Sequence, residues 1–251
     1  MSIKSKFHIA FKILRNPVVF FKKYDKVILL SHMRSRTSVL SHIIGGHEGI
    51  SGYYEQHVDH KERFCNEKIK KNLLVDDELK SGSRYLYDKI LHKRFDPLSL
   101  DSYRVIVMVR KPEESIKSIV SMGVKSDDKW SDIALACSYY SDRLDEILIM
   151  LELKPHIDFC FITSEEFVGD TEVCLDKISD FISLDKLSSS YSSGIKTGIA
   201  VVGDTSDNIK AGKVMLTKPH DDIVLDEYLL AQAEKCYEKF IHKVMALPNR
   251  M

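Results

Sequence analysis

Residues 26–40, KVILLSHMRSRTSVL, are the stretch of sequence that decides the fold. Lys26–Ser31 is a short apolar run of the kind that forms a buried strand, and the apolar spacing beyond it predicts a helix over about 37–44. The loop between them holds Arg34 and Arg36 among several hydroxyl side chains. A helix that follows a strand and a tight loop presents unpaired backbone N–H groups, and arginine adds charged donors. The stretch therefore predicts a loop that binds phosphate or sulfate.

A plainer alternative for this loop stays open, in which Ser35 or Thr37 caps the helix and no anion is bound. The loop is not that of a nucleoside triphosphatase, because GxxxxGK followed by Ser or Thr is absent.

The rest of the chain repeats the alternation of strand and helix. Further strands are predicted at Arg84–Leu91, Arg104–Val109 and Asp158–Thr163, and further helices over 113–121, 129–153, 171–182 and 226–247. We therefore expect a single α/β domain with a central, mainly parallel sheet flanked by helices. Ligands in such folds bind beyond the carboxyl ends of the strands. We therefore expect ligands to bind at the loops that follow Leu30, Lys89, Val109 and Thr163.

The composition is that of a globular protein. The 251 residues are 44% hydrophobic and 29% charged, and 37 basic side chains balance 37 acidic ones. A neutral chain argues against a dedicated nucleic-acid binder. Five cysteines without a CxxC pair indicate neither a zinc site nor a disulfide framework. With no apolar run of about 20 residues and no signal-peptide pattern, we expect a cytoplasmic protein.

Residues 1–25 are expected to form a basic amphipathic segment ahead of one domain over 26–251. The first 26 residues hold seven Lys or Arg and one acid, and basic and apolar positions alternate. Pro17 predicts a helix that is broken near Asn16. Such a helix either packs against the rest of the chain or contacts anionic lipid at the inner membrane surface.

A second candidate anion site follows the strand Arg104–Val109. Arg110 comes directly after this strand, Pro112 suits the first turn of a helix, and Ser118 lies eight positions after Arg110. A cation and a hydroxyl placed in this way can hold one phosphate from two sides. An Arg-x-Pro alone is a weak signal, but two anion sites after two strands suit a ligand with phosphate at both ends.

Together the two loops resemble the donor-binding motifs of sulfotransferases that use 3′-phosphoadenosine-5′-phosphosulfate (PAPS). Residues 33–38 resemble the 5′-phosphosulfate loop of that family, with Met33 in place of Pro and Arg36 in place of Gly. Arg110 and Ser118 are similar to the pair that binds the 3′-phosphate. The resemblance implies a P-loop-NTPase-like domain, PAPS as the donor, 3′-phosphoadenosine-5′-phosphate (PAP) as the product, and no metal. Arginine in place of Gly implies either a turn without positive φ or an added cation.

The resemblance also implies which side chains bind the donor. They are Arg34, Ser35, Arg36, Thr37, Ser38, Arg110, Ser118 and, in a later segment similar to the loop that closes over the nucleotide, Ser206. Residues 163–167 are loosely similar to a Tyr-Glu-Asp-Leu segment of the family, with Ser164 in place of Tyr.

For the reaction, the resemblance implies that Glu55 is the base, because it follows His47 by eight positions as in tyrosylprotein and carbohydrate sulfotransferases. His57 is the reserve, since steroid and phenol sulfotransferases use a histidine. Arg34 is expected to stabilise charge on the transferred group, and Lys89 resembles a lysine at a strand end that points at that group. The alternative that Lys89 is an ordinary strand-end lysine stays open. His92 is a candidate to face the acceptor.

The sequence therefore predicts an enzyme that transfers a sulfuryl group from PAPS to a hydroxyl of a saccharide, lipid-linked sugar or small metabolite. Two alternatives stay open: a P-loop-like nucleotide-dependent kinase, and a scaffold that binds PAPS or another anion without catalysis.

Overall fold

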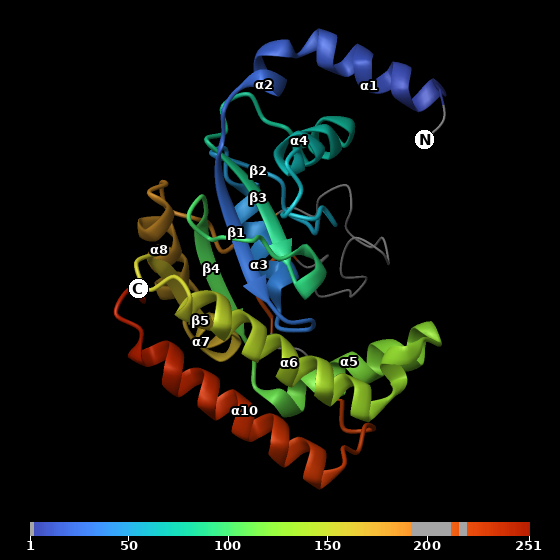
Figure 1. Ribbon diagram of the computed structural model, residues 1–251, viewed down its shortest axis with the longest axis vertical. Helices are drawn as coiled ribbons and strands as arrows, with labels where there is room; N and C mark the ends of the chain where they lie inside the picture. The colour runs from blue at the N-terminus through green and yellow to red at the C-terminus, as the bar shows by residue number, and fades with distance from the viewer. Residues whose placement is uncertain (1–2, 192–211, 216–219) are drawn as a thin grey trace.

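Five parallel strands form the centre of the protein (Figure 1). The computed structural model describes residues 3–191, 212–215 and 220–251. The strand order is β2-β3-β1-β4-β5, and every pair in it is parallel. The strands are β1 (Asp25–Ser31), β2 (Ile50–Ser51), β3 (Tyr85–Ile90), β4 (Arg104–Val109) and β5 (Phe159–Thr163). The predicted α/β class with a parallel sheet is confirmed.

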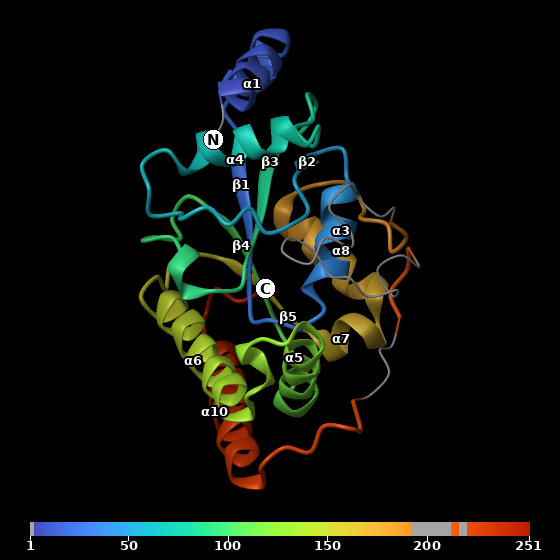
Figure 2. The same cartoon turned by 90° about the vertical axis from the view of Figure 1, so that its right-hand side faces the viewer.

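Helices cover both faces of this sheet, which Figure 2 shows nearly edge-on. They are α1 (Ile3–Arg15), α2 (Pro17–Phe21), α3 (Thr37–Gly46), α4 (Cys65–Val75), α5 (Pro112–Ser126), α6 (Ile133–Glu152), α7 (Ser164–Gly169), α8 (Thr171–Ile182) and α10 (Glu227–Ala246). Two short 3-10 helices, η1 (Lys93–Phe95) and η2 (Lys129–Ser131), lie among them.

The alternation of side chains along β1 explains the layers. Ile28 and Leu30 pack with α5, α6 and α10, while Val27 and Leu29 pack with α3 and α8. All four side chains are buried because a parallel strand between two helical layers has no solvent-facing side.

The strand order reverses at β1. The chain leaves β1 for β2 and β3 on one side, and then crosses to β4 on the other side. Loops that leave neighbouring strands in opposite directions open a crevice at their carboxyl ends, which is where ligands bind in such sheets. The loops after β1 and β4 therefore meet at this position.

Several predicted boundaries need correction. α6 begins at Ile133 rather than 129, because Asp132 accepts a hydrogen bond from Leu135 N and the preceding residues form η2. No loop follows Thr163, since Thr163 and Glu166 form a capping box that starts α7 at once. The sequence pattern missed α4, α7 and β2.

The N-terminal helices lie at the amino ends of the strands (Figure 1). The predicted break near Asn16 is confirmed, with Pro17 at the first turn of α2. Lys12 Nζ donates hydrogen bonds to the carbonyl oxygens of Leu74 and Val75, at the end of α4. α1 thus packs against the rest of the chain, as one of the two alternatives expected. None of the helices in the described ranges is long and apolar enough to cross a membrane.

Candidate functional site

The loop after β1 turns through two arginines in the left-handed region. Arg34 has φ 62° and Arg36 has φ 65°. A side chain at such a φ costs about 1–2 kcal/mol, which glycine would avoid. The expectation that arginine in place of Gly lets the loop turn without positive φ is therefore wrong. The loop keeps the backbone that suits glycine and holds arginine there.

Neither Ser35 nor Thr37 caps α3. The N-cap is Arg36, and it makes no side-chain cap hydrogen bond. Ser35 Oγ instead lies 2.6 Å from Ser31 Oγ and donates to the carbonyl oxygen of His32 at 2.7 Å. The capping alternative is wrong, and the start of α3 keeps backbone N–H groups that a bound anion can accept from.

His32 joins the two loops. Its Nδ1 lies 2.8 Å from the carbonyl oxygen of Met33, and its Nε2 accepts the backbone N–H of Arg110 at 3.0 Å. The ring is fully buried, at 4.7 Å from the ring of Tyr140. Burial, together with the nearby Arg110 and Arg143 charges, lowers the pKa of His32 to about 4. The imidazole is therefore neutral near pH 7 and can accept from Arg110.

The arginines of the two loops meet at Ser118. Arg34 Nε donates to Ser118 Oγ at 2.9 Å, and Arg110 donates from its guanidinium to the carbonyl oxygen of Arg34 at 3.2 Å. Arg110 and Ser118 are both buried. Tyr140 fixes the same loop, because its hydroxyl donates to the carbonyl oxygen of Arg110 at 2.7 Å. Three residues predicted to bind the donor thus form one cationic cluster.

Glu114 supplies the counter-charge to this cluster. Its carboxylate accepts from Arg110 Nε at 3.0 Å and lies 3.7 Å from a guanidinium nitrogen of Arg36. Burial opposes ionisation of Glu114, but the hydrogen bond and charge of Arg110 and the charge of Arg36 outweigh it and lower the pKa. Half of the Glu114 side chain is exposed, so it can leave the arginines when an anion arrives.

Arg36 reaches across to α7. Its guanidinium donates to Ser164 Oγ at 2.7 Å, and Ser164 is fully buried. Ser164, the residue that stands where the family has Tyr, therefore contacts the arginine that stands where the family has Gly. Two of the three departures from the motifs that the sequence resembles, Arg36 and Ser164, are therefore parts of a single contact.

A second cluster lies at the end of β3. Lys89 Nζ is 3.3 Å from Glu55 Oε1 and donates to Ser38 Oγ at 3.2 Å. The Lys89 side chain is 4% exposed and contacts two other predicted site residues, which favours a role in the site over that of an ordinary strand-end lysine. The structure thus brings the predicted base and a hydroxyl from the first turn of α3 into contact with the lysine at the end of β3.

Asp88 holds Glu55 in this cluster. Its buried carboxylate accepts the backbone N–H of Gln56 at 2.9 Å and lies 2.8 Å from His60 Nε2. Burial raises the pKa of Asp88, while the hydrogen bond and charge of His60 oppose the rise. Because Gln56 directly follows Glu55, the Asp88 contact keeps the Glu55 backbone beside β3.

His57 and His92 lie at the margin of the second cluster. His57 is exposed and its ring lies 5.5 Å from that of Phe95. His92 is half-buried, and its ring lies 5.6 Å from that of Tyr139. Burial lowers the pKa of His92, whereas the charge of Glu55 raises it. Of the two candidate bases, Glu55 is the less exposed, and it contacts Lys89 directly.

Two further side chains tie the loops to the sheet. Tyr139 accepts the backbone N–H of Met33 at 3.0 Å and donates to the carbonyl oxygen of Leu91 at 2.8 Å. Proline at position 33 could not donate this bond. Arg143 is 1% exposed, pairs with both carboxylate oxygens of Asp96, and donates to the carbonyl oxygen of Ser31 at 3.1 Å.

Sequence reasoning missed these supporting residues. His32, Tyr139, Tyr140 and Arg143 act through partners far along the chain; Arg143 and Ser31, for example, are 112 positions apart. Glu114 pairs with Arg110, four positions away, and with the distant Arg36. A buried His inside the motif loop was a signal that could have been used.

Ser206 lies outside the described residues. Within the described part of the chain, no group of three or more His, Cys, Asp or Glu side chains could hold a metal ion.

The fold is similar to that of solved sulfotransferases. No family model and no curated protein sequence matches the chain. The sulfotransferase domain of the Synechococcus PCC 7002 olefin synthase is 18% identical, with a TM-score of 0.52 over 86% of this chain and 96% of that chain.

Two other solved sulfotransferases have a similar fold. The sulfotransferase domain from the curacin biosynthetic pathway is 15% identical, with a TM-score of 0.53 over 86% of this chain and 99% of that one. The sulfotransferase from Alicyclobacillus acidocaldarius is 15% identical, with a TM-score of 0.53 over 92% of this chain and 97% of that one. The chain therefore has the P-loop-NTPase-like α/β fold of these sulfotransferases, as expected from its sequence.

Proposed function

We propose that this chain is a PAPS-dependent sulfotransferase, an enzyme of the EC 2.8.2 type. The observation that carries the proposal is the contact of Arg34 and Arg110, from loops after β1 and β4, around Ser118. Fold likeness alone does not give an activity, since one fold serves many functions. The site supports sulfuryl transfer, because this cationic cluster lies in the same site as the Glu55 carboxylate and Lys89 at the end of β3.

The residues present fit a donor with phosphate at both ends of a nucleoside. The start of α3 offers backbone N–H groups, and Ser35, Thr37 and Ser38 lie in the same turn. Arg110 and Ser118 form a second binding point at the end of β4. Arg34 and Arg36 lie between the two, so they can neutralise charge on either group. Ser206 is proposed to add to this site as the sequence predicts.

Glu55 is the proposed base. The reaction forms a bond between the acceptor oxygen and sulfur, breaks the bond between sulfur and the 5′-phosphate oxygen, releases PAP and transfers the acceptor proton to Glu55. Lys89 and Arg34 are cations beside the reacting groups, and a fixed donor of this kind can lower a barrier by roughly 3–4 kcal/mol. His57 is the weaker candidate because it is exposed and lies against Phe95.

The proposed acceptor is a hydroxyl of a saccharide, a lipid-linked sugar or a small metabolite, and the proposed location is the cytoplasm. Residues 26–251 would form the catalytic domain and residues 1–25 an accessory segment.

β1 has seven residues, so its two ends are roughly 20 Å apart at ~3.3 Å per residue. Because α1 and α2 lie at the amino end, they do not line the carboxyl-end site. This placement favours an acceptor that reaches the site from solution.

The experiment that tests the donor is calorimetric titration with PAP. We expect micromolar binding by the wild type, at least about a tenfold loss in Arg110→Ala from the loss of a charge-assisted contact, and no equivalent binding of ATP with magnesium. Retained wild-type affinity in a folded Arg110→Ala would reject the assigned site. Absence of PAP binding would reject the sulfotransferase proposal, and tight ATP-magnesium binding would favour the kinase. PAP binding without sulfate transfer from PAPS to any acceptor in a broad hydroxyl panel would favour the scaffold.

Glu114 provides a second arm of the same titration. Glu114→Gln removes the carboxylate that competes for Arg110 and Arg36, so PAP should bind severalfold more tightly. Glu113→Gln is the matched control, because Glu113 has the same exposure but pairs with Lys117 instead. Equal effects of the two substitutions would show that only overall charge matters.

A further inference from the structure

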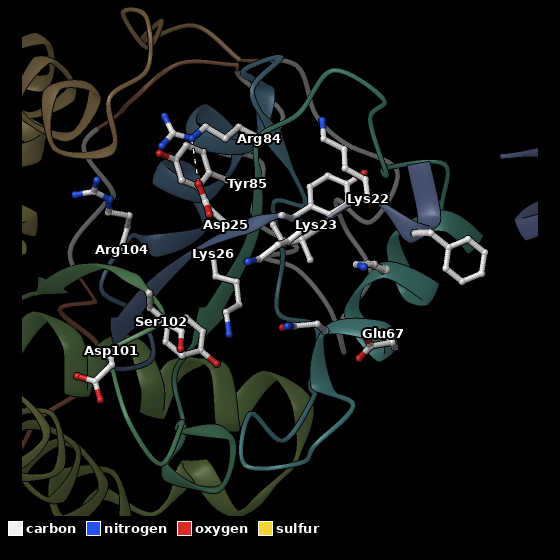
Figure 3. Close-up of a pocket in the computed structure, with 16 residues that line it drawn as sticks. Lys22, Lys23, Asp25, Lys26, Glu67, Arg84, Tyr85, Asp101, Ser102 and Arg104 are labelled. Carbon is white, nitrogen blue, oxygen red and sulfur yellow. Dashed lines mark hydrogen bonds and ion pairs between the residues drawn. The ribbon is translucent and has the colours of Figure 1, made fainter. Parts of the chain in front are cut away.

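A second basic site lies at the opposite edge of the sheet from the proposed active site. A cavity of about 720 Å³ opens around the start of β1, between β3, β4, α2 and α4 (Figure 3). Its lining contains six cationic side chains, Lys22, Lys23, Lys26, Lys70, Arg84 and Arg104, and three acidic ones, Asp25, Glu67 and Asp101. We refer to it as the amino-edge cavity.

Two of its lysines lie on tyrosine rings rather than beside carboxylates. Lys26 Nζ is 4.1 Å from the centroid of the Tyr103 ring, and Lys70 Nζ is 5.7 Å from that of Tyr24. Lys70 is 9% exposed and Lys26 is partly buried, and burial lowers the pKa of Lys26. Among the described residues, no carboxylate lies within ion-pair distance of either ammonium group. Charges held in this way favour a bound anion.

The acids of the lining do not cancel this charge. Asp25 pairs with Arg84 at 3.1 Å, and Asp101 pairs with Lys154, outside the lining, at 2.7 Å. Glu67 is then the remaining acid against Lys22, Lys23, Lys26, Lys70 and Arg104. The cavity therefore carries a positive charge.

An exposed apolar stripe on α1 and α2 continues from the cavity. Phe11 and Leu14 on α1, and Val18 and Phe21 on α2, are each three positions apart and so share a face of their own helix. These four side chains are 53%, 78%, 81% and 74% exposed. Phe21 also lines the cavity. Lys12 holds α1 against α4, so it fixes the side on which Phe11 and Leu14 are exposed. Helices with an apolar stripe and flanking cations insert into the interface of anionic membranes.

We propose that this surface docks on an anionic phospholipid membrane. The four apolar side chains enter the lipid interface, and the amino-edge cavity takes the phosphate of an anionic headgroup on Lys26 and Lys70. The surface fits a membrane better than a protein partner, because the exposed apolar side chains are borne on two short helices and Phe21 among them also lines the cationic cavity. The proposal does not depend on the sulfotransferase assignment, and its test does not use activity.

The test is sedimentation of the full chain with vesicles of phosphatidylcholine alone and of phosphatidylcholine with phosphatidylglycerol. We expect binding to the anionic vesicles that weakens in high salt. Val18→Asp with Phe21→Asp should lower the partition coefficient by more than about tenfold. Lys26→Gln with Lys70→Gln should lower it by about fivefold for each lysine.

Matched controls come from the same chain. Val173→Asp with Ile149→Asp places charge on two other exposed apolar residues, and Lys129→Gln removes a lysine that lies 5.0 Å from the Trp130 ring. These variants should bind the vesicles as the wild type does. Circular dichroism and thermal melting establish that each variant is folded.

Four results would overturn the proposal. Wild-type protein that ignores anionic vesicles would end it, as would vesicle binding that the cavity and stripe variants leave unchanged. Binding of glycerol phosphate at the cavity without vesicle binding would show a site for a soluble anion instead. A change of oligomeric state in Val18→Asp with Phe21→Asp, with no change in vesicle binding, would identify a second copy of the chain as the occupant.

Discussion

His32 decides whether the two arginine loops stay connected. Its Nε2 accepts the backbone N–H of Arg110 only while the ring is neutral. A protonated imidazole donates from both nitrogens, so protonation removes this bond. Full burial makes the connection sensitive to acid well below neutral pH, because the charged ring would be left in an apolar setting.

The stability of the protein should therefore fall in acid through His32. The pKa of His32 is about 4 in the folded chain against an ordinary 6.5, so between these pH values only the unfolded state takes up the proton. Its contribution is full above pH 6.5 and is lost as pH falls to about 4, by ~3 kcal/mol. We expect His32→Asn, measured by urea denaturation at several pH values, to lack this part of the slope. Parallel wild-type and variant curves would contradict the assignment.

Among individual residues, the charged side chains of the site could be located from the sequence, but the buried residues that hold them in place could not. Arg34, Arg110 and Lys89 could be located because ionisable side chains at the carboxyl ends of parallel strands converge on one edge. Glu55 could be located only through the resemblance to sulfotransferases, by its spacing from His47. His32 lies in the same stretch of sequence, yet its role depends on Arg110, 78 positions away. A contact of that separation leaves no local pattern, and only the fold reveals it.

The loop between β1 and α3 combines strain with charge. Arg36 has a φ that favours glycine, and it places a guanidinium between Glu114 and Ser164. The strain is worth about 1–2 kcal/mol. Retention of a strained arginine is expected where its charge serves binding, because strain at a functional site is offset by the surrounding structure.

Arg36→Gly should separate these two effects. Relief of the strain and loss of the Ser164 bond nearly cancel, so the free energy of unfolding should change by less than ~1 kcal/mol. PAP affinity should fall by about tenfold or more, because a charge-assisted contact is lost. Ser183→Gly is the control: Ser183 ends α8 with φ 54° and is exposed, so glycine there should stabilise by up to ~1 kcal/mol without changing PAP affinity. Unchanged PAP affinity in Arg36→Gly would remove Arg36 from the donor site.

Elements with a strong apolar period were predictable, and those without one were not. β4 and α8 have the predicted bounds, because their buried residues recur at the spacing of a strand and a helix. β2 has two residues, too few to show any period, and forms only by pairing with β3. α7 follows β5 with no residue between them, so their patterns merge.

The whole molecule carries two cationic sites at opposite edges of one sheet. The net charge of zero hides this division, because 37 acidic side chains balance 37 basic ones over the whole sequence. The proposed active site faces solvent beyond the carboxyl ends when the amino ends dock on a membrane. Attachment would therefore concentrate the enzyme at a surface without covering its site.

The two sites should act independently. They are separated by the length of β1, roughly 20 Å, and effects of changes this far apart usually add within ~0.5 kcal/mol. We expect Val18→Asp with Phe21→Asp to leave the PAP dissociation constant within about twofold, and Arg110→Ala to leave vesicle binding within the same factor. Calorimetry and vesicle sedimentation on the single and combined variants measure both.

If the two sites are instead coupled, a series of contacts between them could transmit the effect. Asp88, which seats Glu55, contacts His60; His60 Nδ1 lies 3.1 Å from the Tyr103 hydroxyl, and Lys26 lies on the Tyr103 ring. Vesicles that change PAP affinity severalfold would show that the two edges are coupled. Tyr103→Phe keeps the ring under Lys26 but removes the hydroxyl that His60 contacts. If this series of contacts transmits the coupling, the substitution should abolish it. With independent edges, Tyr103→Phe should leave both PAP affinity and vesicle binding unchanged.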